Sequence, residues 1–177
     1  PSLFTCVRHK RTEQQRQINN MGIRIGQGID FHRLEPGFDL WLGGVKIPSE
    51  RGCVAHSDGD VLLHAICDAM LGAAGMRDIG YHFPDNDPAY KNIDSKILLK
   101  RTLDIIKGKG YSVSNIDCTI CLEKPRVAPF VPQMKNVIAE ILGISPDDVS
   151  VKATTTEKMG FTGREEGAVA LAVACLV

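Results

Sequence analysis

Apolar and polar residues alternate in two stretches near the start of this chain. Ile23-Arg24-Ile25-Gly26 has the two-residue period of a strand. Between Leu40 and Ile47, apolar residues flank the pair Gly43-Gly44, an arrangement typical of a hairpin or a bulge. The pattern therefore predicts strands in both stretches.

Three later stretches have apolar residues at helical spacing. The first covers about residues 60–71, and Ser57 or Asp58 stands where a side chain can cap its first turn. The second covers about residues 95–107, and the third covers 133–142 and is followed by a glycine. We expect a helix in each.

Three more apolar stretches have the character of strands, at residues 113–122, 149–153 and 168–177, and the segments 80–88 and 125–132 have the composition of loops. Strands that alternate with helices of this length predict an α/β or α+β fold in which helices pack on a sheet.

Length and charge limit the classes of function. The 177 residues suffice for one domain with its own core, which we place at residues 21–177. Lys and Arg total 21 and so do Asp and Glu, so no net field attracts nucleic acid or a membrane surface. We expect neither partner, and we expect any anionic ligand to be held by a local site.

Residues 1–20 carry four Lys or Arg, one Glu and then a polar run of Gln and Asn. We interpret them as a disordered extension or a remnant of processing or engineering. No apolar run approaches the roughly 20 residues of a membrane-spanning helix, and no secretory signal is evident. The expected location is the cytoplasm, or a plastid or similar organelle if residues 1–20 are a remnant of a targeting peptide.

Six cysteines raise the question of a metal or redox site. Cys118 and Cys121 form a CxxC pair, but they lie in a predicted strand, where a spacing of three places the two thiols on opposite faces. The remaining cysteines are scattered. We therefore expect free thiols.

The first candidate site combines Asp30, His32 and His64. Asp30 and His32 are two apart after the opening strand, so in an extended chain their side chains point the same way. His64 lies on the first predicted helix, and two imidazoles with one carboxylate are a common set of ligands for a divalent metal. By themselves, such residues are more often satisfied by hydrogen bonds within the protein.

The segment Ala55-His56-Ser57-Asp58-Gly59-Asp60 directly precedes the helix that carries His64. Capping accounts for part of this polar cluster, but it does not account for His56. Asp68 follows His64 by four residues and lies on the same helical face, so we expect it to orient the imidazole.

Two further segments are rich in polar side chains. The carboxylates of the proline-containing segment 78–88 suit a fixed ligand, and they equally suit a solvated turn. In segment 152–164, three consecutive threonines precede Glu157, a possible ligand for a phosphate-bound Mg²⁺. Gly26-Gln27-Gly28 stops short of a dinucleotide-binding fingerprint, and no Walker lysine loop is present.

Taken together and in order, these segments resemble the 2-C-methyl-D-erythritol 2,4-cyclodiphosphate synthase family of the non-mevalonate isoprenoid pathway. The likeness runs from about Met21 to Val177 and rests on four segments: residues 24–32, residues 55–60, residues 78–85 and residues 152–164. Gln27 departs from the family, many of whose members carry His there, but this is not a ligand position.

The resemblance implies a role for each matching residue. Asp30, His32 and His64 would hold a zinc-like ion, and Glu157 would bind a second ion, Mg²⁺ or Mn²⁺, with the diphosphate. His56 and Thr155 match the catalytic positions. The substrate would be contacted by Ser57, Asp78, Ile79, Gly80, Phe83, Pro84, Asp85, Asn86, Asp87, Leu122, Glu123, Lys124, Pro125, Arg126, Val127, Ala128, Thr154, Thr156, Phe161 and Arg164.

The resemblance also implies a fold, an assembly and a reaction. The fold would be a small mixed sheet with helices packed on one face. Three copies would form a homotrimer with the sheets facing the three-fold axis and each site shared between neighbours. The enzyme, a phosphorus–oxygen lyase, would cyclise 4-diphosphocytidyl-2-C-methyl-D-erythritol 2-phosphate and release CMP. A zinc phosphohydrolase and a ligand-binding protein without catalysis are the alternatives.

Overall fold

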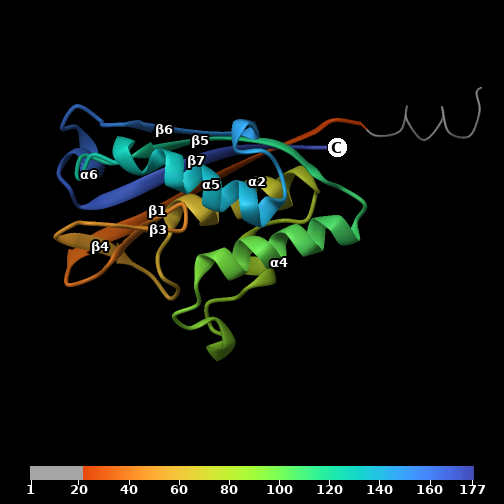
Figure 1. Cartoon of the computed structure of the whole chain (residues 1–177). Helices are drawn as coiled ribbons and strands as arrows, with labels where there is room; N and C mark the ends of the chain where they lie inside the picture. The colour runs from red at the N-terminus through yellow and green to blue at the C-terminus, as the bar shows by residue number, and fades with distance from the viewer. Residues whose placement is uncertain (1–21) are drawn as a thin grey trace, which may run out of the picture.

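The computed structural model describes residues 22–177, so the predicted extension at residues 1–20 lies outside the described residues. A mixed sheet of five strands runs through the molecule in the order β4-β1-β7-β5-β6 (Figure 1). The β5–β6 pair is parallel, and the other three neighbouring pairs are antiparallel. The strands are β1 (Arg24–Pro36), β4 (Arg51–Val54), β5 (Val113–Cys121), β6 (Val149–Thr154) and β7 (Gly167–Leu176).

Strand β1 is much longer than its alternating start predicts. It continues from Arg24 to Pro36 and pairs with β7 over ten residues, while β4, which the sequence did not predict, pairs with its far end. The alternation is obscured because the inward positions at Asp30 and His32 are polar, whereas the outward positions at Ile29 and Phe31 are apolar and exposed.

Three long helices, α2 (Val61–Ala73), α4 (Ser95–Gly108) and α5 (Val131–Leu142), lie on one side of the sheet (Figure 1). Helices α2 and α5 pack on the sheet, and α4 packs on α2 as an outer layer. All three were predicted. Gly143 ends α5 in the left-handed conformation, with φ of 71°, which is the usual geometry of a helix C-cap.

The cap of α2 is not the predicted Ser57 or Asp58 but Asp60, whose carboxylate accepts the Leu63 N–H at 3.0 Å. The same buried carboxylate accepts the N–H groups of Gly43 and Gly44 at 2.9 and 2.6 Å. These glycines form the turn of the predicted hairpin, β2 (Leu40–Leu42) with β3 (Val45–Ile47). Asp60 thereby joins the hairpin to the start of α2.

The segments that were predicted as loops contain short helical turns. Segment 80–88 overlaps α3 (Ile79–His82) and η1 (Pro88–Tyr90), and segment 125–132 contains η2 (Ala128–Phe130). Two more short elements, η3 (Pro146–Asp148) and α6 (Gly160–Gly163), precede β6 and β7.

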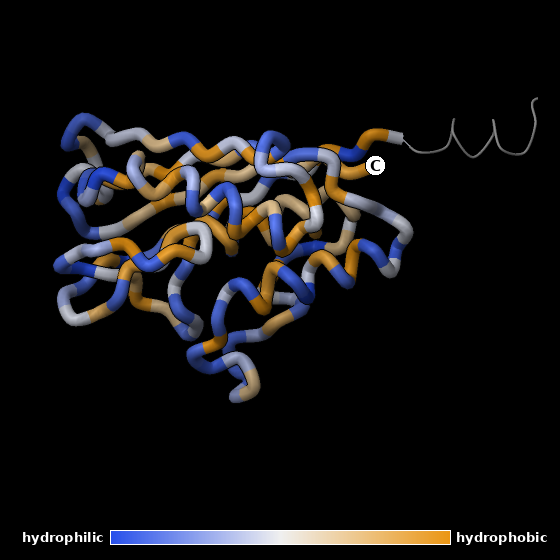
Figure 2. Tube along the Cα trace, in the orientation of Figure 1, coloured by the Kyte–Doolittle hydropathy of each residue, from blue (hydrophilic) through white to orange (hydrophobic). Residues whose placement is uncertain are grey.

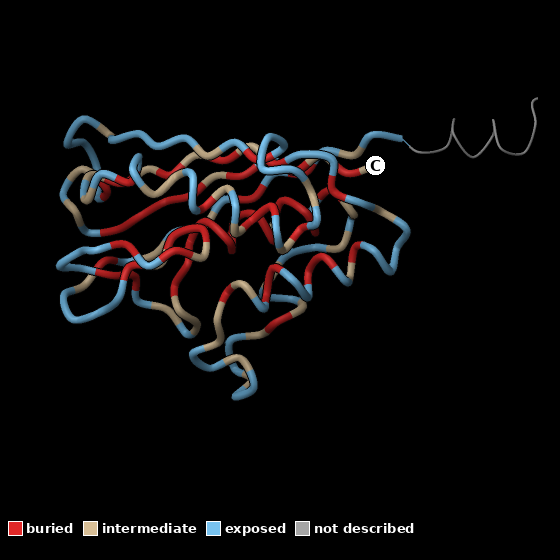
Figure 3. Tube along the Cα trace, viewed as in Figure 1, coloured by how far each residue is buried: buried red, intermediate tan, exposed pale blue. Residues whose placement is uncertain are grey.

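The core lies between the sheet and the helices, where α2 and β7 carry nearly continuous buried residues (Figure 3). Along the outer helix α4, apolar and polar residues alternate (Figure 2), in keeping with one face packed and the other wet. Strand β1 approaches α2 so closely that only glycine fits at Gly26 and Gly28. A Cβ atom at these positions would lie 2.1 and 2.0 Å, respectively, from a backbone oxygen of α2. This contact sets the spacing between the two elements that carry the candidate metal ligands.

The opposite face of the sheet is apolar and exposed in the single chain. Ile25, Ile29 and Phe31 of β1 are 63, 45 and 55% exposed, and Val173 of β7 is 40% exposed beside them. Exposed apolar residues in such number on one sheet face make it a candidate interaction surface.

Within residues 22–177, Cys53, Cys67, Cys118, Cys121 and Cys175 are free thiols. Cys118 is buried and Cys121 is partly exposed, as their opposite faces on β5 predict. Burial raises the pKa of Cys53, Cys67 and Cys118 to about 12. No helix in this part of the chain is long and apolar enough to span a membrane.

Candidate metal centre and pockets

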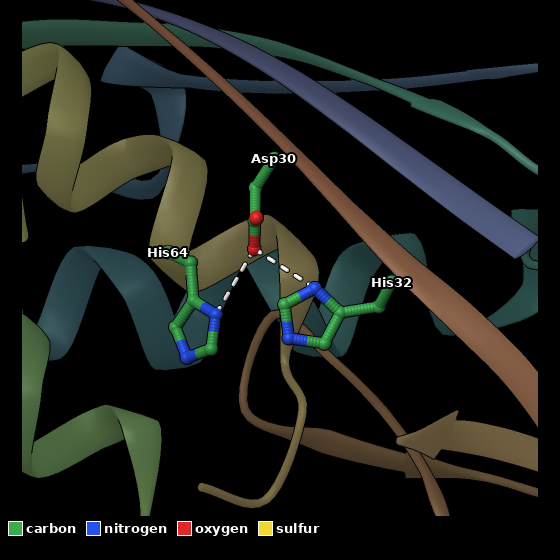
Figure 4. A group of neighbouring side chains, drawn as sticks. All are labelled: Asp30, His32 and His64. Carbon is green, nitrogen blue, oxygen red and sulfur yellow. Dashed lines mark hydrogen bonds and ion pairs between the residues drawn. The ribbon is translucent and has the colours of Figure 1, made fainter. Parts of the chain in front are cut away.

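Two neighbouring elements bring the predicted metal ligands together. Asp30 and His32 project from β1 toward the helices, and His64 projects from α2 toward β1 (Figure 4). Asp30 Oδ2 lies 3.0 Å from His64 Nδ1 and 3.2 Å from His32 Nδ1. One potential ligand atom from each residue lies within 4.8 Å of the others. The predicted convergence is confirmed, although His64 is far in sequence from Asp30 and His32.

The three side chains perturb one another electrostatically. Burial alone raises the pKa of Asp30, but the close contacts with His32 and His64 and the charges of both imidazoles outweigh it and hold that pKa well below its usual range. Burial likewise lowers the pKa of His64, and the hydrogen bond and charge of Asp30 reverse the effect and raise it. The carboxylate is therefore ionised and strongly attractive to positive charge.

The residues fit a divalent cation. One carboxylate and two imidazoles are a usual donor set for zinc that leaves a position for substrate. His32 Nδ1 is buried, and its contact with Asp30 Oδ2 at 3.2 Å falls short of hydrogen-bond geometry. A buried nitrogen without a well-formed hydrogen bond costs free energy, and a cation bound between the three side chains would satisfy it.

A pocket of about 340 Å³ opens directly over these three residues. Its wall includes six further residues that the sequence predicted for the site: His56, Ser57, Ile79, Gly80, Phe83 and Asp85. Ala55, Tyr90, Ile93 and Leu98 complete the wall and were not predicted as contacts. An adjoining pocket of about 480 Å³ is lined by His56 and Asp85 together with Asn86 and Asp87.

Asp68 does not orient His64 as predicted. Its carboxylate accepts the Ile79 N–H at 2.7 Å and so fixes the start of α3 beside the pocket. Asp78 caps α3 by accepting the Tyr81 N–H at 2.8 Å. Both ring nitrogens of His64 have other neighbours, Asp30 on one side and the hydroxyl groups of Ser57 and Ser95 on the other.

A separate pocket of about 290 Å³ lies at the carboxyl ends of the parallel strands β5 and β6. Nearly all of its wall belongs to the predicted cytidine segments: Leu122, Glu123, Pro125, Arg126, Val127, Ala128, Thr154 and Thr155. Lys124 instead lines a neighbouring pocket and pairs with Glu165 at 2.9 Å. In the described part of the chain, this pocket and the one over Asp30 have no wall residue in common.

The remaining predicted residues surround the end of β6. Thr155 Oγ1 donates to Glu157 Oε1 at 3.2 Å. Thr156 Oγ1 lies 2.9 Å from Thr162 Oγ1, so the Thr156 hydroxyl joins the end of β6 to α6. Arg164 makes two hydrogen bonds to Glu166, both of 2.9 Å. These residues and Phe161 do not line the pocket over Asp30.

Sequence reasoning missed Ser95 and the hydrophobic residues of the wall. Ser95 was recognised only as the opening of the second helix, and nothing in its neighbours Asp94 and Lys96 marks it as a contact of His64. The signal that was available is an uncharged polar residue on the apolar side of an amphipathic helix, where it is fully buried.

Comparison with known proteins agrees with this geometry. The family model described as the YgbB family matches residues 23–177. A Bacteroides fragilis protein named 2-C-methyl-D-erythritol 2,4-cyclodiphosphate synthase is 62% identical over 147 residues, which are 83% of this chain and 92% of that protein. Its Porphyromonas gingivalis namesake is 57% identical over 154 residues, 87% of this chain and 95% of that protein.

A solved structure of 2C-methyl-D-erythritol-2,4-cyclodiphosphate synthase in a form bound to CDP superimposes with a TM-score of 0.81. It is 33% identical, and the match covers 87% of this chain and all of that one. With a family model that matches almost the whole described chain and relatives at 57–62% identity, the chain belongs to the YgbB family of 2-C-methyl-D-erythritol 2,4-cyclodiphosphate synthases.

Proposed function

We propose that this chain converts 4-diphosphocytidyl-2-C-methyl-D-erythritol 2-phosphate to 2-C-methyl-D-erythritol 2,4-cyclodiphosphate and releases CMP. The observation that carries the proposal is the convergence of Asp30, His32 and His64 at the base of a pocket, in a chain of this family. The 2-phosphate attacks the β-phosphorus of the same molecule, so no covalent intermediate with the protein is needed.

Asp30, His32 and His64 would hold a zinc ion, because their donor atoms match that ion and His32 Nδ1 makes no well-formed hydrogen bond within the described chain. Glu157 would bind a second ion, Mg²⁺ or Mn²⁺, together with the diphosphate. When bound, these cations offset the repulsion between the phosphate groups that must meet.

The pocket wall would position the methylerythritol part of the substrate. His56 and Ser57 would contact it from the segment before α2, with His56 also steadying the transition state. Asp78, Ile79 and Gly80 would contact it from the start of α3, and residues 83–87 would close around it. Folding a flexible substrate so that its two ends meet is worth several kcal/mol in a well-oriented intramolecular reaction.

Residues at the ends of β5 and β6 would hold the cytidine end. They are Leu122 through Ala128, Thr154 and Thr156, joined by Phe161 and Arg164 from α6 and its end, and Thr155 would steady the transition state with His56. One substrate must then reach two pockets that one chain keeps separate. A homotrimer resolves this difficulty, because the metal residues of one subunit can then face the cytidine residues of the next.

The exposed sheet face supports such an assembly. Ile25, Ile29, Phe31 and Val173 form an apolar surface that three copies can bury around a three-fold axis. Replacing Phe31 with Glu should then release smaller species in light scattering, whereas an unchanged assembly would remove this face from the interface.

The reaction is tested by ³¹P NMR of the purified protein with the substrate, Zn²⁺ and Mg²⁺ in H₂¹⁸O. The cyclase gives one CMP for each cyclic diphosphate and incorporates no ¹⁸O. Inorganic phosphate that carries ¹⁸O would indicate the zinc phosphohydrolase instead, and bound substrate without turnover would indicate a binding protein.

A further inference from the structure

A second layer of side chains stands behind His64, on the side away from Asp30. Ser95, the first residue of α4, is fully buried, and its Oγ lies 2.9 Å from His64 Nε2. The same Oγ donates to Asp58 Oδ1 at 2.5 Å. Asp58 therefore reaches His64 through a single hydroxyl group.

The direction of the hydrogen bonds in this chain follows from the partners of Asp58. Its carboxylate accepts the backbone N–H groups of Ser95 at 3.0 Å and Asp60 at 3.2 Å, so both oxygens already act as acceptors. An ionised carboxylate has no proton to donate. The hydroxyl proton of Ser95 must therefore lie toward Asp58.

Once its proton is committed, Ser95 Oγ presents only lone pairs to His64. At 2.9 Å, His64 Nε2 must then be the donor, because two facing lone pairs would repel each other. Ser57 Oγ, 3.2 Å from the same nitrogen, provides a second acceptor and itself accepts the Gly59 N–H at 3.1 Å. Nδ1 faces the ionised Asp30 at 3.0 Å and donates to it when no cation is bound (Figure 4). Because the Nε2 proton is fixed, the Nδ1 proton is the one that a cation displaces, and the lone pair of Nδ1 then points toward that cation.

We propose that Asp58 and Ser95 are positioning residues, which fix His64 in the tautomer and orientation that present Nδ1 to the cation. This inference rests on the proposed function, since it requires that His64 be a metal ligand. It also explains why the segment before α2 is tied to the start of α4. Partners that hold the second nitrogen of a ligating histidine commonly change metal affinity about 10- to 100-fold when they are removed.

The tautomer can be measured directly in the wild-type protein. Long-range ¹H–¹⁵N spectra of protein with ¹⁵N-labelled histidine distinguish Nδ1–H from Nε2–H, and the signal that is missing in His64→Ala assigns the residue. With Zn²⁺ added, we expect the proton on Nε2 and the metal on Nδ1. A proton on Nδ1 with the metal on Nε2 would overturn the inference without any further variant.

Variants then test whether the hydrogen bonds that link His64 through Ser95 to Asp58 determine the affinity for Zn²⁺. Ser95→Ala removes the nearer of the two acceptors of the Nε2 proton, and Asp58→Asn places an amide donor among groups that already donate. Both should weaken Zn²⁺ binding about 10- to 100-fold in a competition titration, with circular dichroism unchanged. Thr102→Val, which removes another fully buried hydroxyl group from α4 outside the pocket wall, is the matched control and should bind Zn²⁺ within about twofold of wild type.

The outcomes separate this inference from the proposed function. Suppose that wild type binds Zn²⁺, that His64→Ala does not, and that Ser95→Ala and Asp58→Asn bind it as tightly as wild type. The positioning role of Asp58 and Ser95 is then wrong, and His64 remains a metal ligand. If wild type and His64→Ala bind Zn²⁺ equally weakly, His64 is not a metal ligand, and the positioning role is wrong as well.

Discussion

The contact between Gly28 and α2 determines whether the two halves of the metal centre can meet. In Gly28→Ala, the added Cβ would lie 2.0 Å from the Ala65 carbonyl oxygen and 2.7 Å from the Ala69 nitrogen. Because both neighbours are backbone atoms of α2, no side chain can turn away to relieve the overlap.

The size of the effect follows from these distances. To reach an ordinary contact of 3.4 Å, α2 must retreat from β1 by about 1.4 Å, and it carries His64 away from Asp30. Overpacking of this kind costs about 3 kcal/mol or more in the free energy of unfolding. Metal–ligand distances tolerate changes of only about 0.2 Å, so zinc affinity should fall more than tenfold.

The assay pairs urea denaturation with a zinc titration, and Gly72→Ala is the matched control. Gly72 lies on the same helix, and a Cβ there would meet Gln27 O at 3.7 Å, an ordinary contact. That substitution should stabilise the protein by roughly 0.5–1 kcal/mol through helix propensity and leave zinc binding unchanged. A Gly28→Ala protein with wild-type stability and zinc affinity would refute the reasoning.

Three further predictions concern other parts of the chain. Thr155→Ala should slow CMP release about 10²-fold while bound zinc, measured by elemental analysis, stays at the wild-type level; unchanged turnover would remove its catalytic role. Asp60→Ala should lower the free energy of unfolding in urea by about 3 kcal/mol or more, because the N–H groups of Gly43, Gly44 and Leu63 lose their acceptor, and a loss under 1 kcal/mol would contradict that accounting. At pH 8 the high pKa of Cys53, Cys67 and Cys118 should protect them from iodoacetamide until the protein unfolds, and peptide mapping that finds them alkylated in the folded protein would contradict the burial.

Periodicity predicted the long helices because each has an apolar stripe that the core requires. It failed along β1, where function reverses the usual pattern. Asp30 and His32 occupy inward positions, and Ile29 and Phe31 occupy outward ones, so beyond Gly26 the strand no longer resembles a half-buried strand. The polar residues of the site therefore interrupt the alternation from which the strand would have been predicted.

The candidate site was predictable as far as local geometry determines it. The spacing of Asp30 and His32 fixed their common direction, whereas their meeting with His64 was inferred from the family resemblance. Ser95 was not predictable, because it reaches His64 through the packing of α4 on α2. Asp68 was predicted to orient His64, but its carboxylate instead accepts a hydrogen bond from the Ile79 N–H.

Anomalous diffraction at the zinc edge, from crystals grown with Zn²⁺ and CDP, tests the central claim most directly. We expect one strong peak in each subunit, about 2.0–2.2 Å from a carboxylate oxygen of Asp30 and from Nδ1 of His64, with His32 as the third ligand. A zinc peak elsewhere, with Asp30, His32 and His64 holding only one another, would contradict the account.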